Sequence, residues 1–259
     1  MKKLRLDQLL VERGLCESRE GAKRLILAGE VKIGDRVVDK PASSVADDAA
    51  VAVAEKPKFV SRAGLKMEAA LDAFGVDPAG RICMDVGAST GGFTDCLLQR
   101  GAAKVYAFDV GTNQLAWKIR QDERVVVREQ FNCRYMELED VTAGAPDLVV
   151  SDVSFISLTK ILPAIARVIA ADGEVVVLVK PQFELERHEV GKGGIVKDDA
   201  LRAKALEKIV GFATGELAWE MRATMDSPVE GVGGNREFLA WFGAVQGAAR
   251  RFDCQSKLP

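Results

Sequence analysis

Apolar residues recur at helical spacing near the start of the chain. Leu6, Leu9 and Leu10 fall on one side of a helix that stops at Gly14, a residue type common just after the last helical turn. Ser18 stands where a second helix needs an N-cap. The pattern predicts helices over 5–14 and 19–28 and short strands over 31–33 and 36–38. This part of the chain therefore predicts a small α+β unit.

A charged segment with one proline, residues 55–61, separates this unit from a longer region of alternating strand and helix patterns. Strands are predicted over 81–86, 104–110, 125–128, 147–152, 174–180, 217–223 and 237–242, and helices over 93–100, 114–120, 158–171 and 199–212. Uninterrupted apolar runs such as 175–179 are typical of strands that helices cover on both faces. We predict a small α+β domain over 1–58, a doubly wound, Rossmann-like α/β domain over 59–245, and a C-terminal tail over 246–259.

The first long strand leads into a glycine-rich loop, Asp85-Val-Gly-Ala-Ser-Thr-Gly-Gly92. Ligands of open α/β sheets bind beyond the carboxyl ends of the strands, and glycines let a ligand approach the backbone closely. The loop matches neither G-x-G-x-x-G nor the Walker motif, which argues against a nicotinamide dehydrogenase or a P-loop NTPase. Asp109 ends the second strand, where an acidic side chain can bind the hydroxyl pair of a ribose. A tight turn without a ligand would use similar glycines.

This loop resembles the S-adenosylmethionine site of FtsJ-like methyltransferases, whose pattern is Asp-x-Gly-x-x-x-Gly-Gly-Phe/Trp. The resemblance implies a cofactor site formed by Asp85, Gly87, Ala88, Ser89, Thr90, Gly91, Gly92, Phe93, Asp109, Val110, Asp152 and Phe155. Methyltransferases that act on base amino groups usually carry Asp/Asn-Pro-Pro-Tyr/Phe after the fourth strand, whereas this chain has Asp152-Val-Ser-Phe155. Cytosine-C5 enzymes need a cysteine nucleophile, commonly after proline, and no cysteine here follows a proline.

Charged residues occur at or near the ends of apolar strands, where they suit catalysis better than packing. They are Asp152, Lys180 and Glu237, and Lys66 lies just ahead of the α/β region. Each alone could be a charge at the rim of the sheet. Their order is similar to the Lys-Asp-Lys-Glu tetrad of FtsJ-like ribose 2′-O-methyltransferases. The resemblance implies that Lys180 orients or deprotonates the ribose hydroxyl, that Lys66 assists it, and that Asp152 and Glu237 position the lysines.

The N-terminal unit resembles the small RNA-binding domain named after ribosomal protein S4. The resemblance rests on Arg-Leu-Asp-x-Leu-Leu-Val-x-Arg-Gly from Arg5, followed by Ser-Arg-x-x-Ala-x-x-Leu-Ile-x-x-Gly-x-Val-x-Ile from Ser18. It implies that basic side chains of this unit contact structured RNA. The candidate RNA-binding residues are Arg5, Arg19, Lys23, Arg24 and Lys32, with Arg62 and Lys192 added from the α/β region. Without the resemblance, these residues would describe an ordinary solvated basic face.

Motifs along most of the chain resemble the TlyA-type family, also called hemolysin A. They are Ser-Arg-x-Gly-Leu-Lys, Gln-Leu-Ala-Trp, Ser-Asp-Val-Ser-Phe-Ile-Ser-Leu, Val-Lys-Pro-Gln-Phe-Glu and Gly-Lys-Gly-Gly-Ile-Val. The resemblance implies 2′-O-methylation of cytidine in ribosomal RNA within ribosomal subunits. Two alternatives stay open, namely a ribosome-assembly factor that binds RNA without essential catalysis and a membrane-active hemolysin.

Composition and charge narrow these alternatives. The longest stretch without a charge, residues 238–249, is shorter than the ~20 residues of a membrane-spanning helix, and no secretory signal is evident. Five scattered cysteines and a single histidine favour neither a disulfide framework nor a metal site. Residues 1–40 hold ten Lys/Arg against seven Asp/Glu, although the whole chain has a net charge of −2. We expect a cytoplasmic protein with no metal and an anionic partner for its N-terminus.

Overall fold

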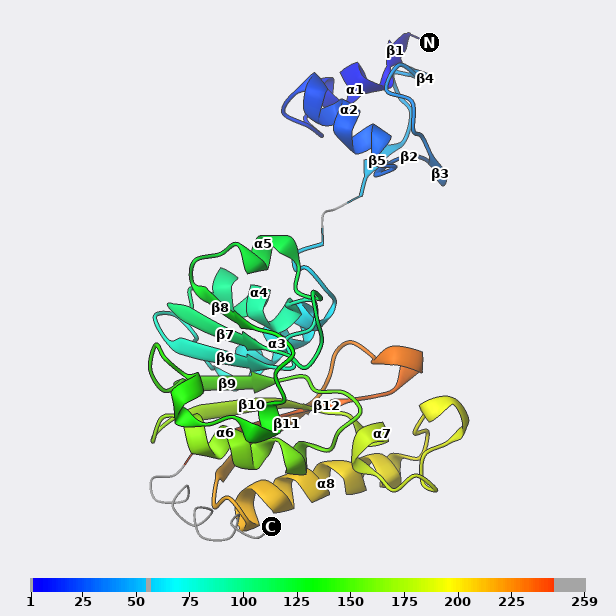
Figure 1. Cartoon of the computed structure of the whole chain (residues 1–259). Helices are drawn as coiled ribbons and strands as arrows, with labels where there is room; N and C mark the ends of the chain where they lie inside the picture. The colour runs from blue at the N-terminus through cyan, green and yellow to red at the C-terminus, as the bar shows by residue number, and fades with distance from the viewer. Residues whose placement is uncertain (1, 55–56, 245–259) are drawn as a thin grey trace. The chain divides into compact units, whose positions relative to one another are not determined.

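The chain folds into two units, which a computed structural model describes over residues 2–54 and 57–244 (Figure 1). Contacts between residues divide the chain into Met1–Pro57 and Lys58–Pro259. The tail predicted over 246–259 and two residues of the predicted linker, 55 and 56, lie outside the described residues. Each unit has a hydrophobic core of its own, so each is described separately.

The N-terminal unit packs two helices against short strands. Its elements are β1 (Lys3–Arg5), α1 (Leu6–Glu12), α2 (Arg19–Leu27), β2 (Val31–Ile33), β3 (Arg36–Val37), β4 (Ser44–Ala46) and β5 (Val51–Val53). Ser18 caps α2 as predicted, because its side chain accepts a hydrogen bond from the Gly21 N–H at 3.1 Å. Leu6, Leu10 and Ile26 are fully buried in the core. The three-residue strands β1, β4 and β5 were not predicted.

A seven-stranded, mostly parallel sheet forms the centre of the second unit, which confirms the predicted α/β fold. Its strands are β6 (Ile82–Val86), β7 (Lys104–Phe108), β8 (Val125–Arg128), β9 (Leu148–Ser151), β10 (Glu174–Val179), β11 (Glu220–Asp226) and β12 (Phe238–Gly243). The strand order is β11-β12-β10-β9-β6-β7-β8, and β12 runs antiparallel to both of its neighbours. The central strands β9 and β10 are almost continuous runs of buried apolar residues, as is typical of strands that helices cover on both faces.

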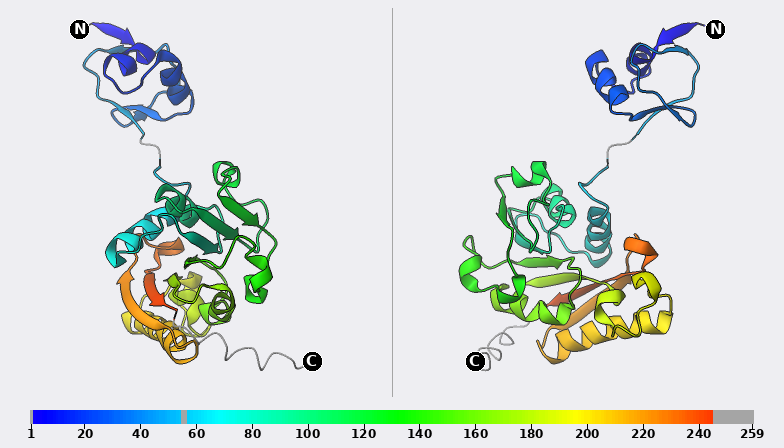
Figure 2. Two further views of the ribbon diagram at one scale, coloured as in Figure 1. Left: turned by 90° about the vertical axis from the view of Figure 1, so that its left-hand side faces the viewer. Right: turned by 45° about the vertical axis from the view of Figure 1, so that its right-hand side comes forward.

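Helices cover this sheet on two sides (Figure 2). They are α3 (Ala63–Phe74), α4 (Gly92–Gln99), α5 (Trp117–Arg120), α6 (Leu162–Val168), α7 (Pro181–Glu184) and α8 (Asp199–Gly215). One apolar cluster joins α3, α4 and α5 to one face, and a second joins α6 and α8 to the other. Helix α3, which carries Lys66, was not predicted. The helix predicted over 114–120 is shorter in the structure because Ala116 has an extended backbone.

The connections place five strand ends at one edge of the sheet. From β6 the chain moves outward through β7 and β8, and it then crosses back to β9, on the other side of β6. The neighbours β6 and β9 therefore mark the point where the strand order reverses. In open α/β sheets, loops separate at such a point and leave a crevice for a ligand. The loops after β6 and β9 carry most of the predicted cofactor residues, and Asp109 and Val110 follow β7.

Residues 2–54 and 57–244 contain neither an apolar helix of membrane-spanning length nor a cluster of side chains that suits a metal ion. In those ranges, no helix is both long enough and apolar enough to cross a membrane. In the same part of the chain, no group of three or more His, Cys, Asp or Glu side chains is arranged to hold a metal ion.

Candidate active site

The glycine-rich loop connects β6 to α4 through a turn with left-handed backbone angles. Gly87 has φ 87° and Gly91 has φ 93°, which side chains with a Cβ rarely adopt. A Cβ at Gly87 would lie 3.1 Å from the carbonyl oxygen of Asp152, so the loops after β6 and β9 approach each other backbone to backbone. A Cβ at Gly91 would instead meet Leu115 at 2.8 Å. Gly91 thus serves the packing of the turn.

Asp85 is a fully buried carboxylate with one of its oxygens unused. Its Oδ2 accepts hydrogen bonds from the Thr94 N–H at 3.0 Å and the Thr94 hydroxyl at 2.7 Å. Its Oδ1 has no hydrogen-bond partner within the described part of the chain. Burial raises the pKa of Asp85 to about 7, although the bonds from Thr94 act in the opposite direction. A buried acceptor without a donor is costly, so this oxygen is suited to a cationic or hydrogen-bonding ligand.

Asp109 joins the loops that follow β6 and β7. It accepts hydrogen bonds from the Ser89 N–H at 2.8 Å and the Gly111 N–H at 2.6 Å. These bonds hold the carboxylate in the lining of the larger of two pockets. Ser89 itself has φ 47°, so the loop is bent sharply where Asp109 holds it.

Two adjoining pockets lie at this edge of the sheet. The larger, of about 470 Å³, is lined by Gly87, Ser89, Asp109, Val110, Gly111, Gln114, Phe131, Asn132, Cys133, Arg134, Asp152, Val153, Ser154, Phe155, Ile156 and Ile161. The smaller, of about 80 Å³, is lined by Ser61, Ala63, Asp85, Gly87, Ala88, Ser89, Thr90, Gly92, Phe93 and Asp152. Gly91 is the one predicted cofactor residue that is absent from both linings. Asp152 belongs to both, so it lies where the two pockets meet.

The sequence interpretation missed much of the wall formed after β8. Residues 131–134 follow that strand and line the larger pocket, and their position after a parallel strand was the available signal. Cys133 is buried in this wall. Burial raises the pKa of the Cys133 thiol to about 12, which keeps it protonated at neutral pH. This wall therefore offers shape and apolar contact, with no thiolate nucleophile.

Lys180 and Asp152 form an ion pair just beyond the ends of β10 and β9. The Lys180 ammonium lies 2.6 Å from Asp152 Oδ1 and donates a hydrogen bond to the Ser154 hydroxyl at 2.8 Å. The parallel register pairs Val177 with Ser151, which brings the two strand ends together. Ser154 was not predicted, although it lies two residues after Asp152 and lines the larger pocket. The structure thus places a lysine against a carboxylate and a hydroxyl that both line the larger pocket.

Lys66 and Glu237 form a second, more deeply buried pair. Lys66 Nζ, from α3, donates to Glu237 Oε2 at 2.5 Å, and the two side chains are 9% and 2% exposed. Glu237 immediately precedes β12, whose antiparallel register with β10 pairs Phe238 with Val179. Glu237 therefore lies opposite Lys180 across the strand pair. All four predicted catalytic residues meet along this edge, as two ion pairs.

Asp152 connects these ion pairs to the pockets. Lys66, Lys180 and Glu237 do not belong to the linings of either pocket, whereas Asp152 belongs to both linings and contacts Lys180. Glu237 also supports the loop that precedes β12, because a Cβ at Gly231 would lie 2.1 Å from Glu237 Oε1. Three of the four charged residues therefore lie outside both pocket linings, and Asp152 is the one that both regions share.

The loop after β9 is held at both ends by the segment that follows β10. Lys180 holds its start, and the buried Glu184 holds its end by accepting from the Ser157 hydroxyl at 2.5 Å and the Leu158 N–H at 2.8 Å. Between these contacts, Phe155 has φ 64° and is 91% exposed, with its ring 5.1 Å from that of Phe183. A left-handed phenylalanine is strained, and such strain is typical of functional loops. Glu184 was not predicted as a site residue.

The predicted RNA-binding residues divide between the two units. In the N-terminal unit, Arg5 and Arg19 both contact the carboxylate of Asp7, and Lys23 pairs with Glu20 at 3.2 Å. The other predicted RNA contacts, Arg24 and Lys32 in this unit and Arg62 and Lys192 in the second, are exposed.

Comparison with protein families assigns both units. The model described as FtsJ-like methyltransferase matches residues 59–244, and the model of the S4 domain matches residues 4–51. The first match covers well over half of the chain. The chain belongs to the FtsJ-like methyltransferase family. The S4 match covers the unit in which most of the candidate RNA contacts lie. Along the chain, the S4 domain therefore precedes the methyltransferase domain.

Individual relatives of this methyltransferase are similar over nearly its whole length. The 16S/23S rRNA (cytidine-2′-O)-methyltransferase TlyA of Mycobacterium tuberculosis is 46% identical over 93% of this chain and 90% of its own. Hemolysin A of Brachyspira hyodysenteriae is 46% identical over 92% of this chain and 99% of its own. A solved structure from Streptococcus thermophilus has a TM-score of 0.72 at 46% identity, covering 95% of this chain and 90% of that one. The resemblance to TlyA and hemolysin A is thereby confirmed.

Proposed function

We propose that the chain transfers a methyl group from S-adenosylmethionine to the 2′-oxygen of cytidine in ribosomal RNA. The observation that carries this proposal is the Lys180–Asp152 contact of 2.6 Å, because Asp152 also lines both pockets. A pocket for a donor and a lysine–carboxylate pair for an acceptor hydroxyl thus share one side chain. The target base and the RNA class come from the name of the TlyA relative.

The residues of the two pockets fit S-adenosylmethionine. Asp85 Oδ1, buried and without a partner in the described residues, suits the ammonium of the methionine part. Asp109 suits the ribose hydroxyls, and the apolar side chains Val110, Phe155 and Ile161 suit the adenine ring. When bound, S-adenosylmethionine supplies a methyl group on a positively charged sulfur, which an oxygen nucleophile can attack.

The ion pairs suit the acceptor side of the reaction. A ribose hydroxyl is a weak nucleophile, so it must be oriented and must lose its proton as it attacks. Lys180 offers a donor that can hold the hydroxyl oxygen, and Asp152 offers an acceptor within the same contact. The Lys66–Glu237 pair flanks Lys180 and fixes the neighbouring strand end. Because these groups are already in place, little reorganisation is needed during the transfer.

RNA docking is assigned to the S4 domain. Arg5, Arg19, Lys23, Arg24 and Lys32 supply cationic side chains there, and Arg62 and Lys192 supply them on the methyltransferase domain. Contacts to phosphates give affinity that is independent of sequence, so selection of one cytidine rests on the shape of the folded RNA. We propose intact ribosomal subunits as the particles that present this shape.

Methyl transfer from labelled S-adenosylmethionine tests the proposal. The acceptors are unmodified bacterial small subunits, large subunits and free ribosomal RNA, and Lys180→Ala is measured in parallel. We expect label on a ribose 2′-oxygen with the unchanged chain alone, and the accepting particle identifies the substrate. If the donor binds and none of the three acceptors is labelled, the assignment to ribosomal RNA is wrong.

The same variant separates an enzyme from a ribosome-assembly factor. An assembly factor acts by binding, so Lys180→Ala should leave its effect on subunit maturation intact. An enzyme that acts through the modification loses that effect together with methyl transfer. Comparing subunit profiles from cells that carry either form distinguishes the two functions.

A further inference from the structure

The N-terminal unit contains a buried carboxylate that two arginines share. Asp7, in the first turn of α1, is fully buried. It accepts two hydrogen bonds from Arg5, from Nε at 3.0 Å and from Nη2 at 2.9 Å, and a third from Arg19 Nη2 at 3.3 Å. Arg5 immediately precedes α1 and Arg19 opens α2. One carboxylate thus holds guanidinium groups from the starts of two helices.

The arginines keep most of their hydrogen-bonding capacity. Each guanidinium has five N–H donors, and the contacts with Asp7 use two on Arg5 and one on Arg19. Their side chains are 45% and 52% exposed, whereas that of Asp7 is 0% exposed. The hydrogen bonds from Arg5, followed by those from Arg19, lower the pKa of Asp7 to about 2. The cluster therefore has one excess positive charge at physiological pH.

We infer that Asp7 is a positioning residue that fixes Arg5 and Arg19 as a preformed clamp for a backbone phosphate of folded RNA. The inference rests on the proposed function, in which this unit docks RNA. A flexible arginine loses rotamer freedom when it binds a phosphate, and that loss weakens binding. In this unit the loss occurs during folding, because Asp7 already restrains both side chains. Guanidinium forks match phosphate oxygens in two-point geometry, so their orientation affects affinity as well as their charge.

Positioning by Asp7 and simple electrostatics predict opposite changes in RNA affinity for Asp7→Asn. Asp7→Asn removes a negative charge from a surface that binds a polyanion, so charge alone predicts tighter binding. Loss of positioning predicts weaker binding, by about tenfold, since two restrained side chains become mobile. Glu20→Gln is the matched control. Glu20 lies next to Arg19 in α2, is 74% exposed, and pairs only with Lys23 among the described side chains.

The test measures binding of the full chain to unmodified 23S ribosomal RNA transcribed in vitro, across a range of salt concentrations. We expect Asp7→Asn to weaken binding about tenfold, and Glu20→Gln to leave it unchanged or tighten it slightly. We also expect the dependence of log affinity on log salt to become shallower in Asp7→Asn by roughly one, because fewer phosphates are neutralised. Equal or tighter binding by Asp7→Asn would overturn the inference.

Because Asp7 is buried, a double-mutant comparison excludes a general effect on folding. Asp7→Asn is introduced into a chain that already carries Arg5→Ala and Arg19→Ala. If Asp7 acts through the arginines, it has no further effect there. If affinity falls by the same factor as before, Asp7 supports the fold of the unit and the inference is wrong. If the unchanged chain does not bind this RNA, RNA docking by the S4 domain is itself wrong, which is a distinct result.

Discussion

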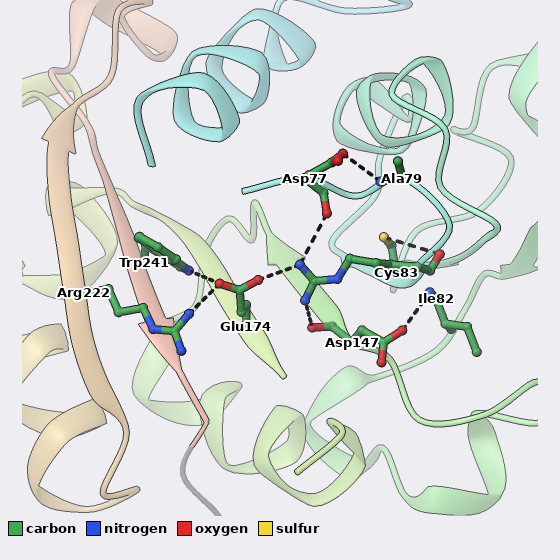
Figure 3. A network of polar contacts seen from close by, with 9 residues as sticks. Asp77, Ala79, Ile82, Cys83, Asp147, Glu174, Arg222 and Trp241 are labelled. Carbon is green, nitrogen blue, oxygen red and sulfur yellow. Dashed lines mark hydrogen bonds and ion pairs between the residues drawn. The ribbon is translucent and has the colours of Figure 1, made fainter. Parts of the chain in front are cut away.

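Strand β10 has an acidic residue at its start and a basic residue just after its end, and the two have opposite surroundings. Glu174, at the start, has hydrogen bonds to both of its carboxylate oxygens (Figure 3). Its Oε1 accepts from Arg222 at 2.6 Å and from Trp241 Nε1 at 3.1 Å, and its Oε2 accepts from Arg81 at 2.5 Å. Lys180, at the other end, contacts Asp152 and Ser154 beside the larger pocket.

Charged residues at strand ends therefore stabilise the fold at one edge of the sheet and face a pocket at the other edge. At the amino edge, Arg81 also donates to the backbone carbonyl of Asp147, so the network joins β6, β9, β10, β11 and β12 (Figure 3). None of these side chains lines either of the two pockets. At the carboxyl edge, the charges meet at a pocket, and Asp85 retains an unused oxygen there. Saturated networks stabilise a fold, whereas partly satisfied groups beside a cavity are available to a ligand.

Lys180→Ala should have the largest effect. Removing a group that orients or deprotonates the nucleophile lowers the rate of methyl transfer by about 10²–10⁴-fold. Donor affinity and the urea midpoint of unfolding should change little, because the side chain lies at the edge of the pocket. Single-turnover methylation measures the rate of methyl transfer, and calorimetric titration with S-adenosylmethionine measures donor affinity. A variant that retained more than a tenth of the rate would contradict a catalytic role for this edge.

Asp85→Asn should weaken donor binding by about 10- to 100-fold, since a hydrogen bond between charged partners is lost. The same change should stabilise the free protein at pH 8. The pKa of Asp85 in the folded chain, about 7, lies above its ordinary value of 3.8, so the folded state binds more protons between these values. Stability therefore falls as pH rises from about 4 to about 7, and the full penalty remains above 7.

Thermal unfolding of both forms at pH 4 and pH 8, without donor, tests this second effect. The stability gained by Asp85→Asn should be larger at pH 8 than at pH 4. A variant that is less stable than the unchanged chain at pH 8 would show that the carboxylate supports the fold, as Glu174 does.

Glu174→Ala should produce the reverse pattern at the amino edge. The change leaves Arg81, Arg222 and Trp241 without their shared acceptor and should lower the free energy of unfolding by about 1–3 kcal/mol. The methylation rate of the folded variant should stay within twofold of the original. Glu220→Ala is the control, because Glu220 also contacts Arg222, at 3.6 Å, but is 66% exposed. In urea unfolding, the free energy of unfolding of Glu220→Ala should be close to that of the unchanged chain.

Ser154→Ala should have the smallest effect. It removes one hydrogen bond to Lys180 and leaves the ion pair with Asp152 in place. The methylation rate should fall by roughly two- to tenfold, with donor affinity preserved. Thr214→Ala, which removes a hydroxyl bonded within α8, is a suitable control. No change in rate would mean that the ion pair alone holds Lys180.

The sequence predicted those parts of the site that lie close together along the chain. The loop from Asp85 to Gly92 is one continuous turn, and its glycines follow from backbone angles that a Cβ would disfavour. Asp109, Asp152 and Lys180 could be placed because each follows a recognisable apolar strand. Lys66 was noted for its place just ahead of the α/β region, and its role came from the family resemblance, because its helix α3 was not predicted. Ser154 and Glu184 were missed because their importance depends on partners 26 to 27 residues away.

The residues alone were enough to predict the α/β fold, the order of its strands along the chain and the family. The fold and the strand order follow from local backbone preferences and from apolar runs, which are properties of neighbouring residues. The family follows from the resemblance of motifs such as the loop from Asp85 to Gly92. The three-dimensional fold was needed to establish that Lys66 pairs with Glu237, that Lys180 pairs with Asp152, and that both oxygens of Glu174 are hydrogen-bonded whereas only one of Asp85 is. The pairing depends on strand register and on how far burial removes each charge from water, and neither quantity exists before the sheet has formed.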